Sequence, residues 1–225
     1  MRYKLVIAFD RDATLGRGDG VAGLIDSEVE HDPRTGLPFL RGRTLKGLLV
    51  EECANILYSL ELQKSPQLPV LEAAAQFSFG RAGSTLEDEG HLWVGPAQMP
   101  EELIQAVELE IENNKIIPAM VLETLTAIRR QTAVDAGSGA PEEHSLRAAR
   151  VLLRDTTLES ELNFRDRPEP EVLALLAACV LGLRRGGGVR NRGRGRFSAR
   201  LLEEGNDCIR TYISSFETLL QGGQP

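Results

Sequence analysis

The feature that most constrains the fold is an apolar segment in the last quarter of the chain. Pro168 and Pro170 precede the sequence EVLALLAACVLGL, and residues 172–183 are apolar almost without interruption. A proline followed by such a run is typical of a helix start. A helix that is apolar nearly all round has to be buried, and this run is too short to cross a bilayer. The segment therefore predicts a helix enclosed by other elements of a globular protein.

The remaining pattern predicts strands before and after two helices. Leucines and other apolar residues recur at helical spacing after Thr44, which we predict to be the N-cap of a helix over 45–60. A terminal helix is expected over 207–220. Residues 11–36 and 132–146 are rich in glycine, proline and charged residues and predict loops. We predict strands over 3–10, 91–97, 116–128, 151–164 and 195–203.

This order of elements predicts an α+β fold. An RRM or ferredoxin-like core has this order: strand, helix, two or more strands, helix and strand. Such a core is an antiparallel sheet with helices on one face. The loops between the elements are insertions into that core. We expect one domain over residues 1–225.

The charge of the chain is unevenly distributed. The formal net charge is −7, from 26 basic and 33 acidic residues, which taken alone argues against nucleic-acid binding. Between Arg184 and Arg200, however, lie seven arginines, five glycines and no acid. Glycines let a backbone approach a phosphate closely, and arginines bind phosphate oxygens in bidentate fashion. The sequence GGGVRNRGRGRF (186–197) therefore indicates a phosphate-binding loop, with a solvated basic loop as the alternative.

A second basic segment precedes the first helix. Arg41, Gly42 and Arg43 lead into Thr44, and Lys46 falls in the first turn. The positive end of a helix dipole disfavours a lysine there unless an anion lies between them. This segment predicts contact with an anion such as an RNA phosphate; the alternative is a surface lysine with no role.

Acidic residues alternate in the loop that follows the first strand. Asp26, Glu28, Glu30 and Asp32 occupy every second position, so in an extended segment they would share one face. Clustered carboxylates can hold Mg²⁺ near a phosphodiester, although charge runs are also common on exposed faces.

Other chemistries lack support in the sequence. The three cysteines are far apart, and no spacing of cysteine or histidine suits zinc or a nucleophilic triad. We expect Trp93 and Phe79 to belong to the core. The first residues, MRYKLVIAFDRD, carry acids where a signal peptide has its apolar region, so we expect a cytoplasmic protein with no membrane partner.

Taken together, these motifs resemble the RAMP superfamily, specifically the repeating backbone subunit of type III CRISPR–Cas effector complexes. The resemblance spans residues 5–202 and is strongest over 24–49, IDSEV through HDPRTGLP to the TLKG helix start. The family more commonly has Pro-Gly-Ser-Ser-Leu-Lys-Gly at that start. This chain departs at the proline and the serines and keeps the glycine, a hydroxyl and Leu-Lys-Gly.

The resemblance implies an RNA-guided endoribonuclease. Its partners would be a guide RNA, a complementary single-stranded target RNA, other CRISPR effector subunits and copies of itself in a head-to-tail filament. Asp26 matches the catalytic aspartate, with Mg²⁺ or another divalent cation as its cofactor. A thumb-like β-hairpin would occupy approximately residues 124–150. The resemblance and the basic segments together give as RNA-binding candidates Arg43, Thr44, Lys46, Arg129, Arg130, Thr132, Arg190, Arg192, Gly193, Arg194 and Gly195.

Three other functions stay open at this stage. Some related subunits keep the fold and bind RNA without cleaving it. A stand-alone ribonuclease would process precursor RNA with a histidine such as His31. An acidic scaffold protein would use the arginine loop to bind a protein partner.

Overall fold

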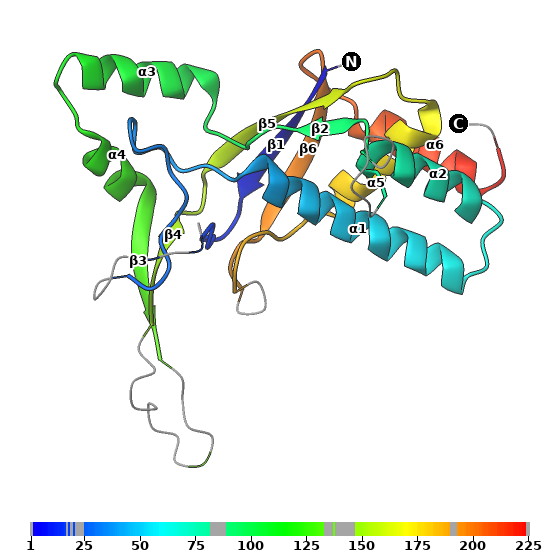
Figure 1. Ribbon diagram of the computed structural model, residues 1–225, viewed down its shortest axis with the longest axis horizontal. Helices are drawn as coiled ribbons and strands as arrows, with labels where there is room; N and C mark the ends of the chain where they lie inside the picture. The colour runs from blue at the N-terminus through cyan, green and yellow to red at the C-terminus, as the bar shows by residue number, and fades with distance from the viewer. Residues whose placement is uncertain are drawn as a thin grey trace.

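The computed structural model describes residues 2–16, 18, 20, 25–81, 89–132, 137, 147–189 and 193–223. Its centre is an antiparallel sheet in the order β2-β5-β1-β6-β7 (Figure 1). The strands of this sheet are β1 (Arg2–Phe9), β2 (Leu92–Val94), β5 (Thr157–Phe164), β6 (Phe197–Glu203) and β7 (Asn206–Asp207).

The connections between these strands confirm the predicted ferredoxin-like core. The chain leaves β1, forms two helices and returns as β2, and β5 then inserts between β1 and β2. From β5 a single helix leads to β6 on the other side of β1. Two such split βαβ units make the ferredoxin-like fold. The short β7 extends the sheet at its edge.

The two faces of the sheet differ in polarity because side chains alternate along each strand. In β1, Tyr3, Leu5, Ile7 and Phe9 are buried in the core. Lys4, on the opposite face, lies across from Glu161 and forms an ion pair of 2.7 Å with Glu159. The first face is therefore covered by helices, and the second carries charged residues.

Four helices pack around the apolar face. They are α1 (Gly42–Leu62), α2 (Leu68–Phe79), α5 (Pro170–Gly182) and α6 (Ile209–Leu220). Helix α5 contacts α1, α2, α6 and the sheet, and it is buried from Val172 to Val180. This confirms the enclosed helix predicted from the apolar run. Cys53, Cys179 and Cys208 are buried free thiols.

The elements between β2 and β5 lie on the other side of the molecule (Figure 1). They are α3 (Glu101–Glu112), α4 (Pro118–Leu125), β3 (Thr126–Gln131) and β4 (Arg147–Leu152). Strands β3 and β4 pair as an antiparallel hairpin that extends away from the sheet, from Thr126 opposite Leu152 to Gln131 opposite Arg147. This is the segment for which a thumb-like hairpin was expected.

Several local predictions are wrong. The predicted strand over 116–128 is mostly helix α4, because Pro118 occupies the first turn of a helix, where proline is favoured. The predicted strand over 151–164 is two strands in different sheets, separated by a turn at Asp155 with a φ of 64°. Helices α2 and α3 were not predicted.

Two predictions about single residues are also wrong. Helix α1 begins at Gly42 with Arg41 as its N-cap, so Thr44 lies inside the first turn. Trp93 is 54% exposed on the open face of the sheet, because it occupies the outward position of β2 between buried Leu92 and Val94. No helix in the described part of the chain is both long and apolar enough to span a membrane.

Candidate nucleic-acid interface

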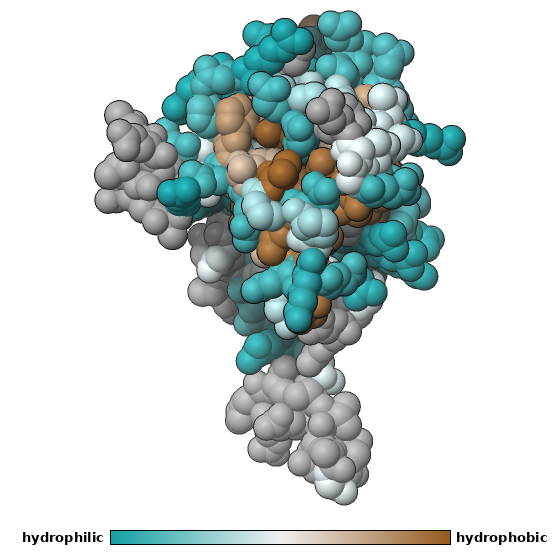
Figure 2. All heavy atoms as spheres, turned by 90° about the vertical axis from the view of Figure 1, so that its right-hand side faces the viewer, coloured by the Kyte–Doolittle hydropathy of each residue, from teal (hydrophilic) through white to brown (hydrophobic). Residues whose placement is uncertain are grey.

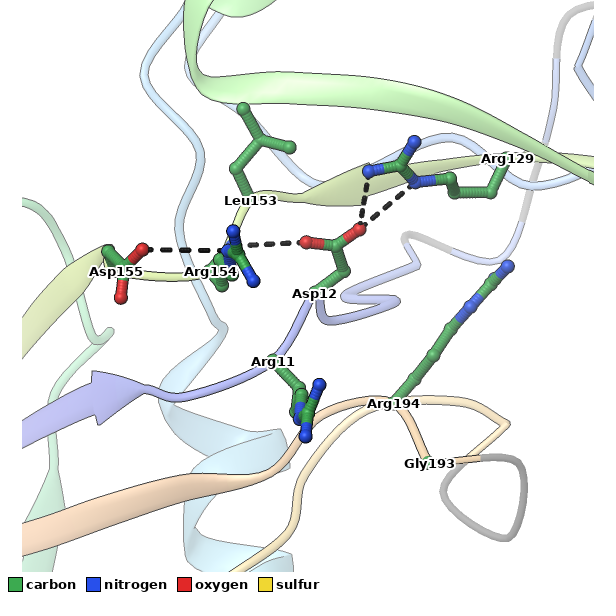
Figure 3. A pocket seen from close by; sticks show the side chains of 8 residues that line it. All are labelled: Arg11, Asp12, Arg129, Leu153, Arg154, Asp155, Gly193 and Arg194. Carbon is green, nitrogen blue, oxygen red and sulfur yellow. Dashed lines mark hydrogen bonds and ion pairs between the residues drawn. The ribbon is translucent and has the colours of Figure 1, made fainter.

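Four segments of the chain meet in one pocket beyond the end of β1 (Figure 3). Arg11 and Asp12 follow β1, Arg129 comes from β3, residues 153–155 follow β4, and Gly193 and Arg194 belong to the arginine–glycine loop. The pocket has a volume of about 750 Å³. The fold thus brings the root of the hairpin, the arginine–glycine loop and the first strand together.

Asp12 organises the centre of this pocket. Its Oδ2 accepts hydrogen bonds from Nε and Nη2 of Arg129 at 3.0 and 2.8 Å, and its Oδ1 accepts one from the Arg154 amide at 3.2 Å. The pocket is lined by four arginines and two aspartates, a formal charge of +2. Arg11 and Arg154 are exposed there. An exposed arginine cluster of this kind suits a polyanion with phosphate groups.

The arginine–glycine loop is anchored to the end of β1. The Gly195 amide donates to the Asp12 carbonyl at 2.8 Å, and the Gly186 amide donates to the Gly195 carbonyl at 2.9 Å. Gly195 has a φ of 68°, and a Cβ there would lie 2.0 Å from the Gly186 carbonyl oxygen. Only glycine therefore fits this position. Nη1 of Arg194 lies 3.4 Å from the Thr14 hydroxyl oxygen. The candidates Arg190 and Arg192 lie outside the described residues.

A second, smaller pocket lies beside the start of α1. It has a volume of about 290 Å³ and is lined by residues 14–16, by Arg41 and Thr44 of the helix start, and by Gly187 and Gly188. Arg41 Nη2 forms an ion pair of 2.8 Å with Glu30. Thr44 and Arg43 are exposed. The free N–H groups of a helix start beside a glycine segment favour an anion.

Lys46 lies half-buried one turn into α1. Burial lowers the pKa of its ammonium group, and the carboxylate of Glu89 partly opposes that shift. Within the described part of the chain it has no ion-pair partner at 4.0 Å or less. A partly desolvated lysine gains from an added anion because the anion compensates its lost hydration.

Asp26 lies on the flank of the hairpin. Its carboxylate is exposed, and its Oδ2 accepts a hydrogen bond of 2.6 Å from the amide of Ala148 in β4. The Asp26 amide donates to the Ala148 carbonyl at 2.8 Å. These bonds fix the orientation of an exposed carboxylate through one of its two oxygens.

The alternating acids do not form one cluster. Glu28 is buried and pairs with Arg150, Glu30 pairs with Arg41, and Asp32 bonds to Arg34. Among the described residues no group of three histidines, cysteines or acids is placed to hold a metal ion. The shared carboxylate face expected from the spacing is therefore wrong, because Glu28 turns into the interior.

The candidates in β3 are split between two faces of the hairpin. Arg129 faces Asp12, and Arg130 is exposed and registers with Ala148. Consecutive strand residues point to opposite faces, so Arg129 and Arg130 cannot serve the same pocket. Thr132 is exposed and directly follows the end of β3 at Gln131.

Sequence reasoning missed four of the charged residues that line the larger pocket, namely Arg11, Asp12, Arg154 and Asp155. Asp12 and Arg11 stand immediately after the first strand, where a polar pair at a strand end was a usable signal. Arg154 was not selected because it lay inside the predicted strand over 151–164, which in the structure contains a turn.

The fold and this interface define a ferredoxin-like α+β protein with an arginine-lined surface for a polyanion. A model of the RAMP superfamily matches residues 18–198, and the chain belongs to that superfamily.

Two solved structures show the same fold across almost the whole chain. A chain of the type III-B Cmr-beta complex in its apo state has a TM-score of 0.62 and 14% identity, covering 92% of this chain and 99% of that one. A chain of type III-B Cmr-beta bound to cognate target RNA has a TM-score of 0.63 and 14% identity, covering 95% and 99%. A search of curated protein sequences gives no match.

Proposed function

We propose that this protein is a backbone subunit of a type III CRISPR effector complex that binds guide RNA and cleaves a complementary target RNA. The superfamily match and the shared fold with chains of Cmr-beta, one of them bound to target RNA, support the first part. The observation that carries the proposal is the pocket of four arginines where β1, the hairpin root and the arginine–glycine loop converge. Phosphates of an RNA would lie there and at the start of α1.

Sequence recognition would be left to base pairing between guide and target. The basic residues of the two pockets and Lys46 lie on loops, a hairpin and a helix start, and they would contact backbone phosphates, which carry no sequence information. A protein of this kind reads the shape of an RNA duplex, as other RNA-guided proteins do. Affinity for RNA should then fall steeply with salt.

Asp26 would act on the target strand beside the hairpin. Its Oδ2 is held by the Ala148 amide, and Oδ1 is the oxygen available to accept a proton from an attacking 2′-hydroxyl. That hydroxyl would attack the adjacent phosphorus in line with the leaving 5′-oxygen, so that a 2′,3′-cyclic phosphate forms, the bond from phosphorus to the 5′-oxygen breaks, and the released 5′-oxygen takes a proton from water. Arginines nearby would stabilise the negative charge that develops on the phosphate.

A divalent cation fits this site if Asp26 and the phosphates of the bound RNA hold it together. Mg²⁺ is usually held by one or two carboxylates together with water and substrate phosphates, and Asp26 presents one exposed carboxylate. When bound, Mg²⁺ would supply positive charge next to the scissile phosphate.

Apolar surfaces at two ends of the molecule support assembly with other subunits. The end formed by α1, α2 and α6 has apolar side chains in its centre with polar ones around them (Figure 2), and Leu62, Val70 and Leu220 are exposed on these helices. On the opposite side, α3 and the segment after it expose Leu109 and Ile117. Two different apolar surfaces favour head-to-tail contact between copies, since a two-fold dimer would use one surface twice.

The test is cleavage of a matched target RNA by the assembled complex carrying Asp26→Ala or Asp26→Asn. We expect both variants to bind guide and target normally and to lose cleavage at the sites served by this subunit. The control is Glu161→Gln, which removes an exposed carboxylate from the open face of the sheet.

Other outcomes separate the competing functions. Normal cutting by Asp26→Ala would show that this subunit binds RNA without cleaving it. Cutting that persists in EDTA and is lost in His31→Ala would indicate a histidine-dependent ribonuclease. His31 is half-buried, with Nδ1 2.9 Å from the Val29 carbonyl oxygen. Recovery of the complex without RNA would point to a protein scaffold.

A further inference from the structure

We propose that a buried ion pair, Glu28 with Arg150, positions Asp26 by fixing its loop to the hairpin. This inference rests on the proposed role of Asp26 in cleavage. It assigns to Glu28 and Arg150 a positioning role rather than a catalytic one.

The Asp26 loop behaves as an added strand on the hairpin. Ser27 pairs in parallel with Ala149 of β4, alongside the two hydrogen bonds between Asp26 and Ala148. The Arg150 amide also donates to the Ser27 carbonyl at 3.0 Å. Residues 26 and 27 are thus bonded to β4 over three consecutive residues, so the Asp26 carboxylate moves with the hairpin.

The ion pair joins the residue after this short strand, Glu28, to Arg150 of β4. Arg150 Nε is 2.8 Å from Oε1 of Glu28, and the side chains are 16% and 6% exposed. The same Glu28 oxygen accepts a hydrogen bond from the Val29 amide at 2.9 Å. Two buried charges are costly to remove from water, and they persist in this place only while each has its partner. Loss of either charge therefore has to loosen the loop.

The pair also reaches the base of the hairpin. Nη1 of Arg150 donates to the Thr126 hydroxyl at 3.2 Å, and that hydroxyl donates to the Leu122 carbonyl at 2.5 Å. Thr126 begins β3 and Leu122 belongs to α4. Arg150 therefore joins four segments: the Asp26 loop, β4, β3 and α4. The Asp26 carboxylate would therefore have a fixed position relative to β4 and to an RNA bound against the hairpin.

The decisive variants are Glu28→Gln and Arg150→Lys in the assembled complex. Misplacement of a reacting group by about 1 Å can slow a reaction roughly a hundredfold, so we expect single-turnover cleavage to fall roughly ten- to a hundredfold. Target affinity should change less than about twofold, because both side chains are mostly buried and are paired with each other. The control is Glu159→Gln, which breaks an ion pair on the open face of the sheet and should cut at the wild-type rate.

A second measurement reads the loop without reference to activity. Amide hydrogen exchange should become faster in the peptides that contain residues 25–29 and 147–152, with the sheet and α5 unchanged. The double variant Glu28→Gln with Arg150→Met removes both buried charges, so we expect it to assemble more readily than Glu28→Gln alone and still to cut slowly.

The outcomes are separable from those of the proposed function. Wild-type cleavage in Glu28→Gln, or an equal loss of binding and cleavage, would overturn the positioning role. If Glu28→Gln does not assemble, the positioning role is tested with Arg150→Lys, which keeps the buried cation. The measurements are again single-turnover cleavage and target affinity. If Asp26→Ala cuts normally, the proposed cleavage is wrong, and hydrogen exchange alone decides whether the pair orders the loop.

Discussion

The carboxylate of Asp12 holds the guanidinium of Arg129 through two hydrogen bonds, of 3.0 and 2.8 Å, across 117 positions of sequence. This contact joins the end of the central strand to the first strand of the hairpin. It also occupies the one arginine of β3 that faces the pocket. The aspartate thus stabilises the pocket, and under the proposed function it would compete with an RNA phosphate for Arg129.

Replacing Asp12 with asparagine should separate these two effects. We expect the free energy of unfolding to fall by about 1 kcal/mol, because a charge-assisted, partly exposed pair is lost. RNA should bind more tightly, and the slope of log K against log salt should steepen by about 1, because Arg129 becomes available to a phosphate. Denaturant unfolding and a salt series of binding measurements test both.

Asp155→Asn is the matched comparison for this variant. It removes the same charge from the same pocket, but Asp155 is 86% exposed and lies 3.7 Å from Arg154. We expect almost no change in stability and a smaller change in affinity. Weaker RNA binding by Asp12→Asn would contradict the competition between Asp12 and phosphate.

Lys46 should make RNA binding sensitive to alkaline pH. Burial lowers the pKa of Lys46, so its ammonium group loses its proton at a lower pH than an exposed lysine. The affinity for RNA should therefore decrease as pH rises through this lowered pKa. Near that pH, the binding of RNA should be accompanied by uptake of a proton. In Lys46→Met we expect weaker binding at neutral pH and a flat pH profile in the same range.

The stability of the free chain should respond in the opposite sense. A lysine whose pKa is lower in the folded than in the unfolded state opposes folding while it is charged in both states. That penalty is relieved as pH rises through the folded pKa toward the unfolded value. Lys46→Met should remove this dependence, and equal pH profiles for the two proteins would show that Lys46 is fully solvated.

The arginine–glycine loop should tolerate alanine at one glycine and not at another. Gly193 and Gly195 both have positive φ, 79° and 68°, yet a Cβ at Gly193 meets nothing within 4 Å. Gly193→Ala should cost about 1 kcal/mol from backbone strain alone. Gly195→Ala should cost clearly more and weaken RNA binding, because the Gly186 backbone has to move. Similar losses in the two variants would mean that the loop root is not rigid.

Trp93 provides an optical test of the open face of the sheet. It is the only tryptophan in the chain and is 54% exposed. We expect long-wavelength emission from the isolated chain and quenching by acrylamide almost as efficient as in the denatured protein, since water reaches the indole ring. Blue-shifted, weakly quenched emission would show that this face is covered.

The sequence predicted those elements whose pattern is decided locally. The apolar run of α5 and the spacing of leucines in α1 both survive in the structure, because one face or all faces of these helices enter the core. The strand predicted over 116–128 failed because β-branched Ile116 and Ile117 resemble a strand while Pro118 starts a helix. At these residues the local preference for a strand differs from the helix that the chain forms in the folded protein.

The candidate site was harder to predict because its parts are distant in sequence. Gly193 and Arg194 were selected from composition, and the structure places them in the pocket. Asp12 was not selected, since an isolated aspartate has no meaning until Arg129 is known to face it. Glu28 was grouped with the exposed acids, and only the position of Arg150 in β4 explains why it is buried.

The central position of the first strand has a consequence for how the protein is made. Arg2 pairs with Asn163, and Phe9 pairs with Phe197, so β1 has no neighbour in the sheet until most of the chain has been synthesised. Contacts of such large sequence separation form late in folding. The arginine pocket also needs Arg154 and Arg194. A nascent chain on the ribosome therefore has neither the central sheet nor the arginine pocket, and under the proposed function guide RNA would be loaded only onto finished subunits.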